Sequence, residues 1–288
     1  MSEKGIFIGN RVNVFNEIID ISDIDIVKIF AVADSYLSNY LDHEHIEYDT
    51  IRCKEELISD IQTLDYDYLI SNGCPYILPI SHLQRRDELY INIHPSLLPD
   101  LRGKHPINGA YLFNRSLGVT CHLMDDGIDT GKILEQIKIG APSDMSLWLA
   151  YKLCFDAEGD VFRNAYNNHF SIGKIYPLDK EPVYYTRKEE DLIFDFNMSL
   201  EDIICKIKAF SIDSQGARFF FKGYQFIVLE CEVLNIEYLN ERLDNSEEGE
   251  IIKIYDNNLI VKKDSKLLYL KQVKGNVQLL KESQIIVS

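Results

Sequence analysis

Four short apolar runs, separated by segments with helical spacing, constrain the fold of this 288-residue chain most strongly. They are KGIFIGN (4–10), VKIFAVAD (27–34), YDYLISNG (66–73) and YINIH (90–94). Each run is short, and most end in turn residues, so each predicts a buried strand. Intervening stretches such as KEELISDIQTL (54–64) have the apolar periodicity of a helix, which favours parallel strands joined by crossover helices. The pattern predicts an α/β fold with an open, Rossmann-like, mostly parallel sheet covered on both faces.

Two further strands and a long helix are expected to complete this first domain. GVTCHLM (118–124) and KILEQIKI (132–139) predict strands on either side of a Gly/Asp-rich loop. Residues 146–168 follow with the spacing of a long helix. We therefore place the first domain at residues 1–180.

The remaining chain, residues 181–288, predicts a linker and a smaller β-rich domain. Two prolines and mixed charge over residues 175–192 are typical of a linker. One helix is expected at SLEDIICKIKAF (199–210), and alternating strands follow around turn residues. A barrel is one arrangement that such strands can take.

Composition limits the partners and the compartment. A formal charge of −16 and a pI near 4.8 oppose binding to a nucleic-acid backbone, which needs a contiguous basic face. Small anions remain compatible with a few local cations. The six cysteines lie far apart, which predicts free thiols, and the chain opens without an apolar leader or a later membrane-spanning run. We expect a cytoplasmic protein that does not enter the membrane.

His94 and Asn92 stand where open α/β sheets bind ligands. One residue separates them in a predicted strand, so both side chains point to one face at its carboxyl end. There an imidazole can move protons and an amide N–H can donate to a developing oxyanion. Asp129 is the best carboxylate to orient the imidazole or take a proton. From these residues alone, a catalytic trio and a purely structural role are equally supported.

Two other segments carry weaker signals. Gly9-Asn10-Arg11 follows the first strand, so Asn10 and Arg11 are candidate anion contacts, with an ordinary turn as the alternative. The absence of GxGxxG argues against a dinucleotide cofactor. The acidic loop 125–131 lacks the spacing of a calcium-binding loop, which leaves a tight acidic turn and no expected metal.

The pair NIHPSLLP (92–99) and HLMDDGIDTGKIL (122–134) resembles the folate-dependent formyltransferases. The resemblance implies that Asn92, His94 and Asp129 are catalytic. An amine would attack the formyl carbon of N10-formyltetrahydrofolate, the co-substrate. Asn92 and His94 would stabilise the oxyanion, and Asp129 and His94 would manage protons.

The same resemblance implies where the folate binds. SNGCPYILP (71–79) is similar to the family segment whose backbone contacts the pterin ring. The candidate folate-binding residues are Cys74, Tyr76, Ile77, Leu78, Asp125, Asp126, Gly127 and Ile128. The apolar residues among them also suit plain core positions.

The C-terminal segments point to the acceptor. Residues 184–197 and 207–226 are similar to the region after the core in nucleotide-sugar N-formyltransferases, although IDSQG lacks the proline of that pattern. Residues 248–273 also resemble the β-barrel tail of methionyl-tRNA formyltransferase, which makes tRNA the rival acceptor. The acidic net charge favours the sugar nucleotide over tRNA.

The sequence thus predicts formyl transfer to the amine of a dTDP- or UDP-linked aminodeoxy sugar, for surface glycans such as the O-antigen of lipopolysaccharide. The candidate substrate contacts are Asn10, Arg11, Arg102, Lys104, Tyr184, Tyr185, Arg187 and Phe220. Formyltetrahydrofolate hydrolase is a further alternative, disfavoured because the chain starts directly at the first strand. We expect no nucleic-acid partner, and a homodimer formed through exposed C-terminal strand edges.

Overall fold

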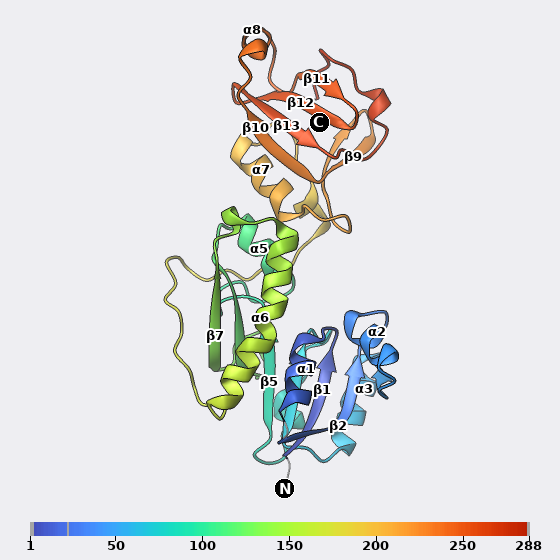
Figure 1. Ribbon diagram of the computed structural model, residues 1–288, viewed down its shortest axis with the longest axis vertical. Helices are drawn as coiled ribbons and strands as arrows, with labels where there is room; N and C mark the ends of the chain where they lie inside the picture. Colours follow the sequence, from blue (N-terminus) through green and yellow to red (C-terminus); the bar gives the residue numbers. More distant parts are fainter. Residues whose placement is uncertain (1–2, 22, 287–288) are drawn as a thin grey trace. The chain divides into compact units, whose positions relative to one another are not determined.

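The computed structural model describes residues 3–21 and 23–286 and divides the chain into two compact units, drawn in Figure 1. The first unit contains the described residues up to Pro106, Ser116–Gly140 and Tyr151–Tyr185. The second contains Ile107–Arg115, Ala141–Ala150 and the residues from Thr186 onward. Two short segments that precede residue 151 thus belong to the second unit, and the contiguous division at residue 180 stays a prediction.

A seven-stranded sheet forms the centre of the first unit, with strand order β3-β2-β1-β4-β5-β6-β7. The strands are β1 (Glu3–Gly9), β2 (Ile24–Ala31), β3 (Asp49–Thr50), β4 (Tyr68–Asn72), β5 (Leu89–His94), β6 (Leu117–Leu123) and β7 (Ile133–Gly140). The pairs from β3 to β5 are parallel, whereas β5–β6 and β6–β7 are antiparallel. The predicted α/β fold with a mostly parallel sheet is confirmed.

Helices cover both faces of this sheet, which explains why its central strands are apolar throughout. The helices are α1 (Asn13–Asp20), α2 (Tyr36–His43), α3 (Lys54–Thr63), α4 (Ile80–Leu83) and α6 (Leu147–Asn167), of which α6 begins in the second unit. Phe7 of β1 contacts Phe15 of α1, with ring centroids 5.5 Å apart. Its neighbours Ile6 and Ile8 share a core cluster with residues of α3 and α4. Successive residues of β1 therefore face different helices.

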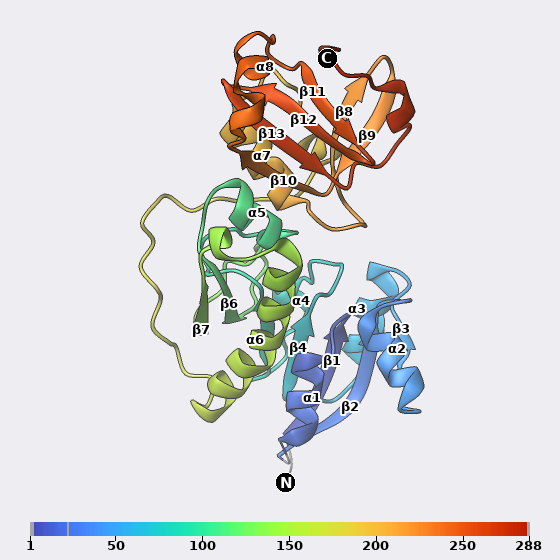
Figure 2. The same cartoon turned by 45° about the horizontal axis from the view of Figure 1, so that its top comes forward.

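The second unit is β-rich, as predicted, and Figure 2 shows its strands from a second direction. Its helices are α5 (Pro106–Leu112), α7 (Leu200–Ala209) and α8 (Asn240–Asp244), and its strands are β8 (Ala217–Phe221), β9 (Tyr224–Val228), β10 (Glu230–Leu234), β11 (Ile251–Tyr255), β12 (Asn258–Lys263) and β13 (Lys266–Lys271). Short 3-10 helices occur at Pro142–Asp144, Glu189–Leu192, Glu237–Leu239 and Val277–Leu279. Strands β10-β13-β12-β11 form one antiparallel sheet, and β8–β9 form a separate hairpin.

Local sequence explains the hairpins of this unit. Lys222 and Gly223 have φ values of 50° and 79°, the left-handed conformation that a two-residue hairpin turn needs. Within β8, Phe219 is buried and stacks on Phe226 with centroids 5.1 Å apart. Phe220 between the buried rings is 41% exposed. Side chains along β8 alternate between the core and the solvent because a β-strand is pleated.

The helices α2 and α5 were not predicted, because their apolar patterns are short and weak. All six cysteines are unpaired thiols, as expected. Among the described residues, none of the helices is both long and apolar enough to cross a membrane.

Gly131 provides a test of the packing at the junction of β6 and β7. A Cβ at this position would lie 1.7 Å from the Leu123 carbonyl oxygen, a backbone atom that cannot move independently. We expect Gly131→Ala to lower the free energy of unfolding by about 1–3 kcal/mol, the usual cost of overpacking. Gly5→Ala is the control, since its Cβ would first meet the ends of the Ile24 and Ile26 side chains. Equal denaturant midpoints for the two variants would contradict this explanation.

Candidate active site

The antiparallel pairing of β5 with β6 brings Asn92 directly opposite His122. The Asn92 amide Nδ2 donates to His122 Nε2 at 3.1 Å. His122 Nδ1 lies 2.8 Å from the Leu123 carbonyl oxygen, which can only accept. His122 is therefore protonated on Nδ1 and offers the lone pair of Nε2 to Asn92.

His94 lies at the carboxyl end of β5 with its side chain buried. Its Nε2 donates to the Leu101 carbonyl oxygen at 3.0 Å. The opposite ring nitrogen, Nδ1, lies 3.6 Å from Asp129 Oδ2. The hydrogen bond to Leu101 places the proton of a neutral imidazole on Nε2, so Nδ1 is the atom that can accept a proton.

Asp129 joins the two histidines. It follows β6 in the left-handed conformation, with φ of 52°. Its Oδ2 faces His94, and its Oδ1 lies 3.7 Å from His122 Nε2. The Gly103 amide donates to Oδ2 at 2.9 Å, which orients the carboxylate. The three residues predicted as a catalytic trio thus lie in one cluster.

Sequence reasoning missed His122, the fourth member of this cluster. Burial is the main reason that the pKa of His122 falls to about 4, and nearby His94 lowers it further, while Asp129 opposes the shift. His122 is therefore neutral at pH 7. The sequence predicted a strand at residues 118–124 but not its partner strand. His122 reaches the cluster only because β6 pairs with β5.

A buried polar network holds the segment after β5. The Thr120 hydroxyl donates to the Ser96 carbonyl oxygen at 2.6 Å and accepts from the Leu98 amide at 3.1 Å. Gln136 of β7 donates to the Leu98 carbonyl oxygen at 2.8 Å. The Leu98–Pro99 peptide bond is cis. These contacts fix the chain that leads from His94 to Leu101.

The two predicted folate-binding segments lie next to each other. Cys74 and Tyr76 pack against the core cluster that includes Leu78, and Met124 joins them from the end of the other segment. Burial raises the pKa of the Cys74 thiol to about 11, so this thiol stays protonated at neutral pH. Asp126 Oδ1 accepts from the Ser81 amide at 3.0 Å and so connects the acidic loop to the start of α4.

Several of the predicted folate contacts already have partners within the protein. Leu78 is 1% exposed, so its side chain is a core residue and only its backbone is left for a ligand. Asp125 Oδ1 accepts from the Thr130 hydroxyl at 2.5 Å and from the Gly127 amide at 2.9 Å, which makes it a loop-closing residue. Ile77 and Ile128 are exposed apolar side chains.

Arg11 is not a free cation at the end of β1. Its guanidinium forms an ion pair with Glu158 of α6 and lies 4.5 Å from the centroid of the Phe155 ring. Complete burial raises the pKa of Glu158 to about 7, although the adjacent Arg11 opposes that shift. Asn10 donates its backbone N–H to the Asn72 carbonyl oxygen at 3.1 Å. The expectation that Arg11 holds a substrate anion is thus weakened by its internal partner.

The other predicted substrate contacts differ in accessibility. Arg102 is half-buried, and its Nε is buried without a hydrogen-bond partner among the described residues, while Lys104 is exposed. Tyr184 is 59% exposed, but Tyr185 is buried, so the Tyr185 ring cannot stack on a ligand without rearrangement. Arg187 and Phe220 belong to the second unit.

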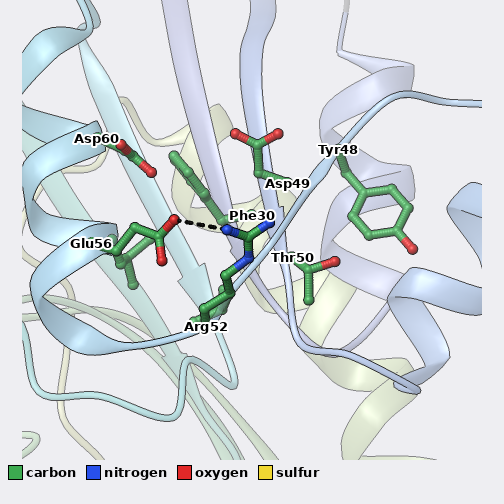
Figure 3. A pocket seen from close by; sticks show the side chains of 9 residues that line it. Phe30, Tyr48, Asp49, Thr50, Arg52, Glu56 and Asp60 are labelled. Carbon is green, nitrogen blue, oxygen red and sulfur yellow. Dashed lines mark hydrogen bonds and ion pairs between the residues drawn. The ribbon is translucent and has the colours of Figure 1, made fainter.

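A separate surface pocket of about 340 Å³ lies beside β3, and Figure 3 shows the side chains that line it. An ion pair of 3.3 Å between Arg52 and Glu56 crosses it. The pocket contains none of the predicted catalytic residues. Within residues 3–21 and 23–286, no group of three or more His, Cys, Asp or Glu side chains is placed to hold a metal ion.

Two segments of the chain match known protein families. Residues 32–162 match the formyl transferase family, and residues 187–281 match the formyl transferase C-terminal domain. The methionyl-tRNA formyltransferase of Francisella philomiragia is 30% identical over 76% of this chain and 68% of its own length. The chain therefore belongs to the formyltransferase family. It is an enzyme of the formyl-transfer class, as the sequence predicted.

Solved structures share the fold. A 4-N formyltransferase from Francisella tularensis has a TM-score of 0.67 and 21% identity, covering 81% of this chain and 99% of the other. The N-formyltransferase from Helicobacter canadensis, solved with folinic acid and dTDP-3-aminofucose, has a TM-score of 0.68 and 17% identity, covering 95% of this chain and 100% of the other.

The lowered pKa of His122 predicts a pH dependence of stability. Below about pH 6.5 the unfolded chain protonates this residue while the folded protein does not until about pH 4. Stability from His122 is thus complete above pH 6.5 and is lost as the pH falls to 4, by about 3 kcal/mol.

Chemical denaturation of wild type and His122→Gln between pH 4 and 7 measures this term. Wild type should lose more stability on acidification than the variant. The opposite contribution of Glu158 is common to both proteins and cancels. Exposed His43 supplies the control variant, His43→Gln. A wild-type-to-His122→Gln difference that is constant with pH would be evidence against a neutral buried His122.

Proposed function

We propose that this enzyme transfers the formyl group of N10-formyltetrahydrofolate to the amine of an aminodeoxy-sugar nucleotide. The observation that carries the proposal is the cluster of Asn92, His94, His122 and Asp129 at one end of the sheet. Formyl transfer to an amine needs an oxyanion donor, a proton acceptor and a charge partner, and this cluster supplies all three.

The adjacent segments support a folate co-substrate. Residues 74–78 and the loop from Asp125 to Ile128 flank the end of β4 and the approach to Asp129. They present backbone groups together with the exposed side chains of Ile77 and Ile128. Backbone donors and acceptors would contact the pterin ring, and apolar side chains would cover it. The structural relative from Helicobacter canadensis was solved with folinic acid, which supports a folate co-substrate.

Each cluster member has a step in the proposed reaction. The acceptor amine attacks the formyl carbon, and the carbonyl oxygen becomes an oxyanion. Asn92 has a second amide N–H besides the one donated to His122, and this N–H would donate to the oxyanion.

Proton transfer follows from the tautomer of His94. Its Nδ1 would accept the proton that the amine loses, and Asp129, 3.6 Å away, would stabilise the imidazolium. Collapse of the intermediate would break the bond between the formyl carbon and N10, and the leaving N10 would take the proton from the His94 imidazolium.

Charge supports a small anionic acceptor. The net charge is −16, and acidic residues outnumber basic ones both before and after residue 185. A tRNA backbone would be repelled by such a chain, whereas a diphosphate needs only a few donors. The Nε of Arg102, which has no hydrogen-bond partner in the described part of the chain, is one such donor, next to the Gly103 amide that contacts Asp129.

Methionyl-tRNA is the second candidate acceptor. The observation that favours it is the identity of 30% to a methionyl-tRNA formyltransferase across most of this chain.

A sugar-nucleotide acceptor would place the enzyme in the cytoplasm and its product in surface-glycan synthesis. The expected homodimer is also part of this proposal.

The acceptor is tested by incubating the purified protein with N10-formyltetrahydrofolate and a panel of dTDP- and UDP-linked amino sugars, with charged initiator tRNA in parallel. We expect a mass increase of one formyl group on an amino-sugar nucleotide. Formylation of tRNA alone would overturn the sugar assignment, and folate turnover without any acceptor would indicate a hydrolase.

Asp129→Asn tests the catalytic assignment. The substitution keeps the shape of the side chain but removes the charge beside His94, so kcat should fall about 10²–10⁴-fold, the range of general acid–base effects. Titration with 5-formyltetrahydrofolate should give a dissociation constant near that of wild type. The control is Asp213→Asn, whose exposed carboxylate forms an ion pair with Lys274 in the second unit. A kcat for Asp129→Asn equal to that of the control would exclude the proposed role.

A further inference from the structure

We propose that Asp100 is a positioning residue for the formyl-transfer site, because it connects the segment 183–185 to the backbone that orients His94 and Asp129. The inference rests on the catalytic roles proposed above. We call residues 100–103 the holding loop. Asp100 would not touch the reacting atoms and would act through this loop.

The holding loop contacts both catalytic side chains through its backbone. The Leu101 carbonyl oxygen accepts from His94 Nε2 at 3.0 Å. The Gly103 amide donates to Asp129 Oδ2 at 2.9 Å. A shift of this backbone would therefore move the imidazole and the carboxylate together. Displacing a catalytic group by about 1 Å can cost 10²-fold in rate.

The loop adopts a conformation that needs external support. Leu101 has φ of 56° and Gly103 has φ of 102°, both in the left-handed region. A leucine in that region is strained and persists only where surrounding contacts determine it. The Leu101 side chain is buried, so its packing supplies part of the support that holds this backbone conformation.

Asp100 supplies a further part of that support. Its Oδ1 accepts from the Leu101 amide at 3.1 Å and from the Val183 amide at 2.8 Å. The Ser96 hydroxyl donates to the Asp100 carbonyl oxygen at 2.7 Å. Asp100 is 5% exposed, so both amides that it binds would lose a buried partner on truncation.

A second hydrogen bond also joins the holding loop to residues 183–185. The Tyr185 amide donates to the Arg102 carbonyl oxygen at 2.8 Å. Residues 183–185 and the holding loop therefore form one hydrogen-bonded strip. Tyr184, a proposed acceptor contact, lies in this strip. This acceptor contact and the catalytic groups would thus be joined by backbone hydrogen bonds within the first unit.

The test compares Asp100→Ala with Glu88→Ala. Glu88 is the matched control because it is also a buried carboxylate that accepts two backbone amides, those of Arg85 and Arg86, at 3.1 and 2.6 Å. It precedes β5 at the end opposite His94. Both variants should lose thermal stability, so a purely structural role predicts the same kinetics for the two.

The readouts are kcat and the pH titration of the His94 ring protons, followed by NMR. Asp100→Ala should lower kcat about 30-fold or more and shift the His94 titration, with 5-formyltetrahydrofolate affinity within about threefold of wild type. Glu88→Ala should leave kcat and the titration near wild type. Asp100→Asn, which keeps an acceptor oxygen, should recover most of the lost kcat.

Val183→Pro removes the N–H that donates to Asp100 Oδ1 and should therefore reproduce the loss of kcat. This variant replaces Asp100→Ala in the test if Asp100→Ala does not fold. Because His94 is titrated without any acceptor, this readout stands even if the acceptor is not a sugar nucleotide. An unchanged His94 titration in Asp100→Ala, or equal kcat losses in Asp100→Ala and Glu88→Ala, would overturn the proposal.

Discussion

The antiparallel pairing of β5 with β6 is the constraint on which the candidate site depends. It sets Asn92 opposite His122 and carries the chain directly into the turn that presents Asp129. A slip of one residue would send the side chains of one strand to the other face of the sheet. The parallel half of the sheet anchors β5 through β4, so the register of the site is secured by the core.

Backbone groups rather than side chains give the cluster its orientation. The carbonyl oxygens of Leu101 and Leu123 select the tautomers of His94 and His122, and the Gly103 amide orients Asp129. Because burial keeps His122 neutral, the charge that develops during proposed proton transfer is concentrated on His94 and Asp129. One cluster can thus combine a fixed hydrogen-bond donor with a proton acceptor.

The sequence was sufficient for the mostly parallel sheet, because short apolar runs depend on local periodicity. From the residues alone the trio was open, and its catalytic role rests on the resemblance to the formyltransferases and stays a prediction. The sequence was insufficient for His122 and Asp100, whose roles arise from strand pairing and from a segment more than eighty positions away. Arg11 shows the same limit, since its partner Glu158 lies on a helix far along the chain. Non-local partners decide whether a charged side chain is free for a ligand.

A crystal structure with an aminodeoxy-sugar nucleotide and a folate analogue that carries a non-transferable formyl group at N10 would test the central claim most directly. We predict the formyl oxygen at hydrogen-bond distance, about 2.9 Å, from Asn92 Nδ2, and the sugar amine nearest to His94 Nδ1. Folate bound elsewhere, such as in the pocket beside Arg52, or an amine directed away from His94, would contradict it.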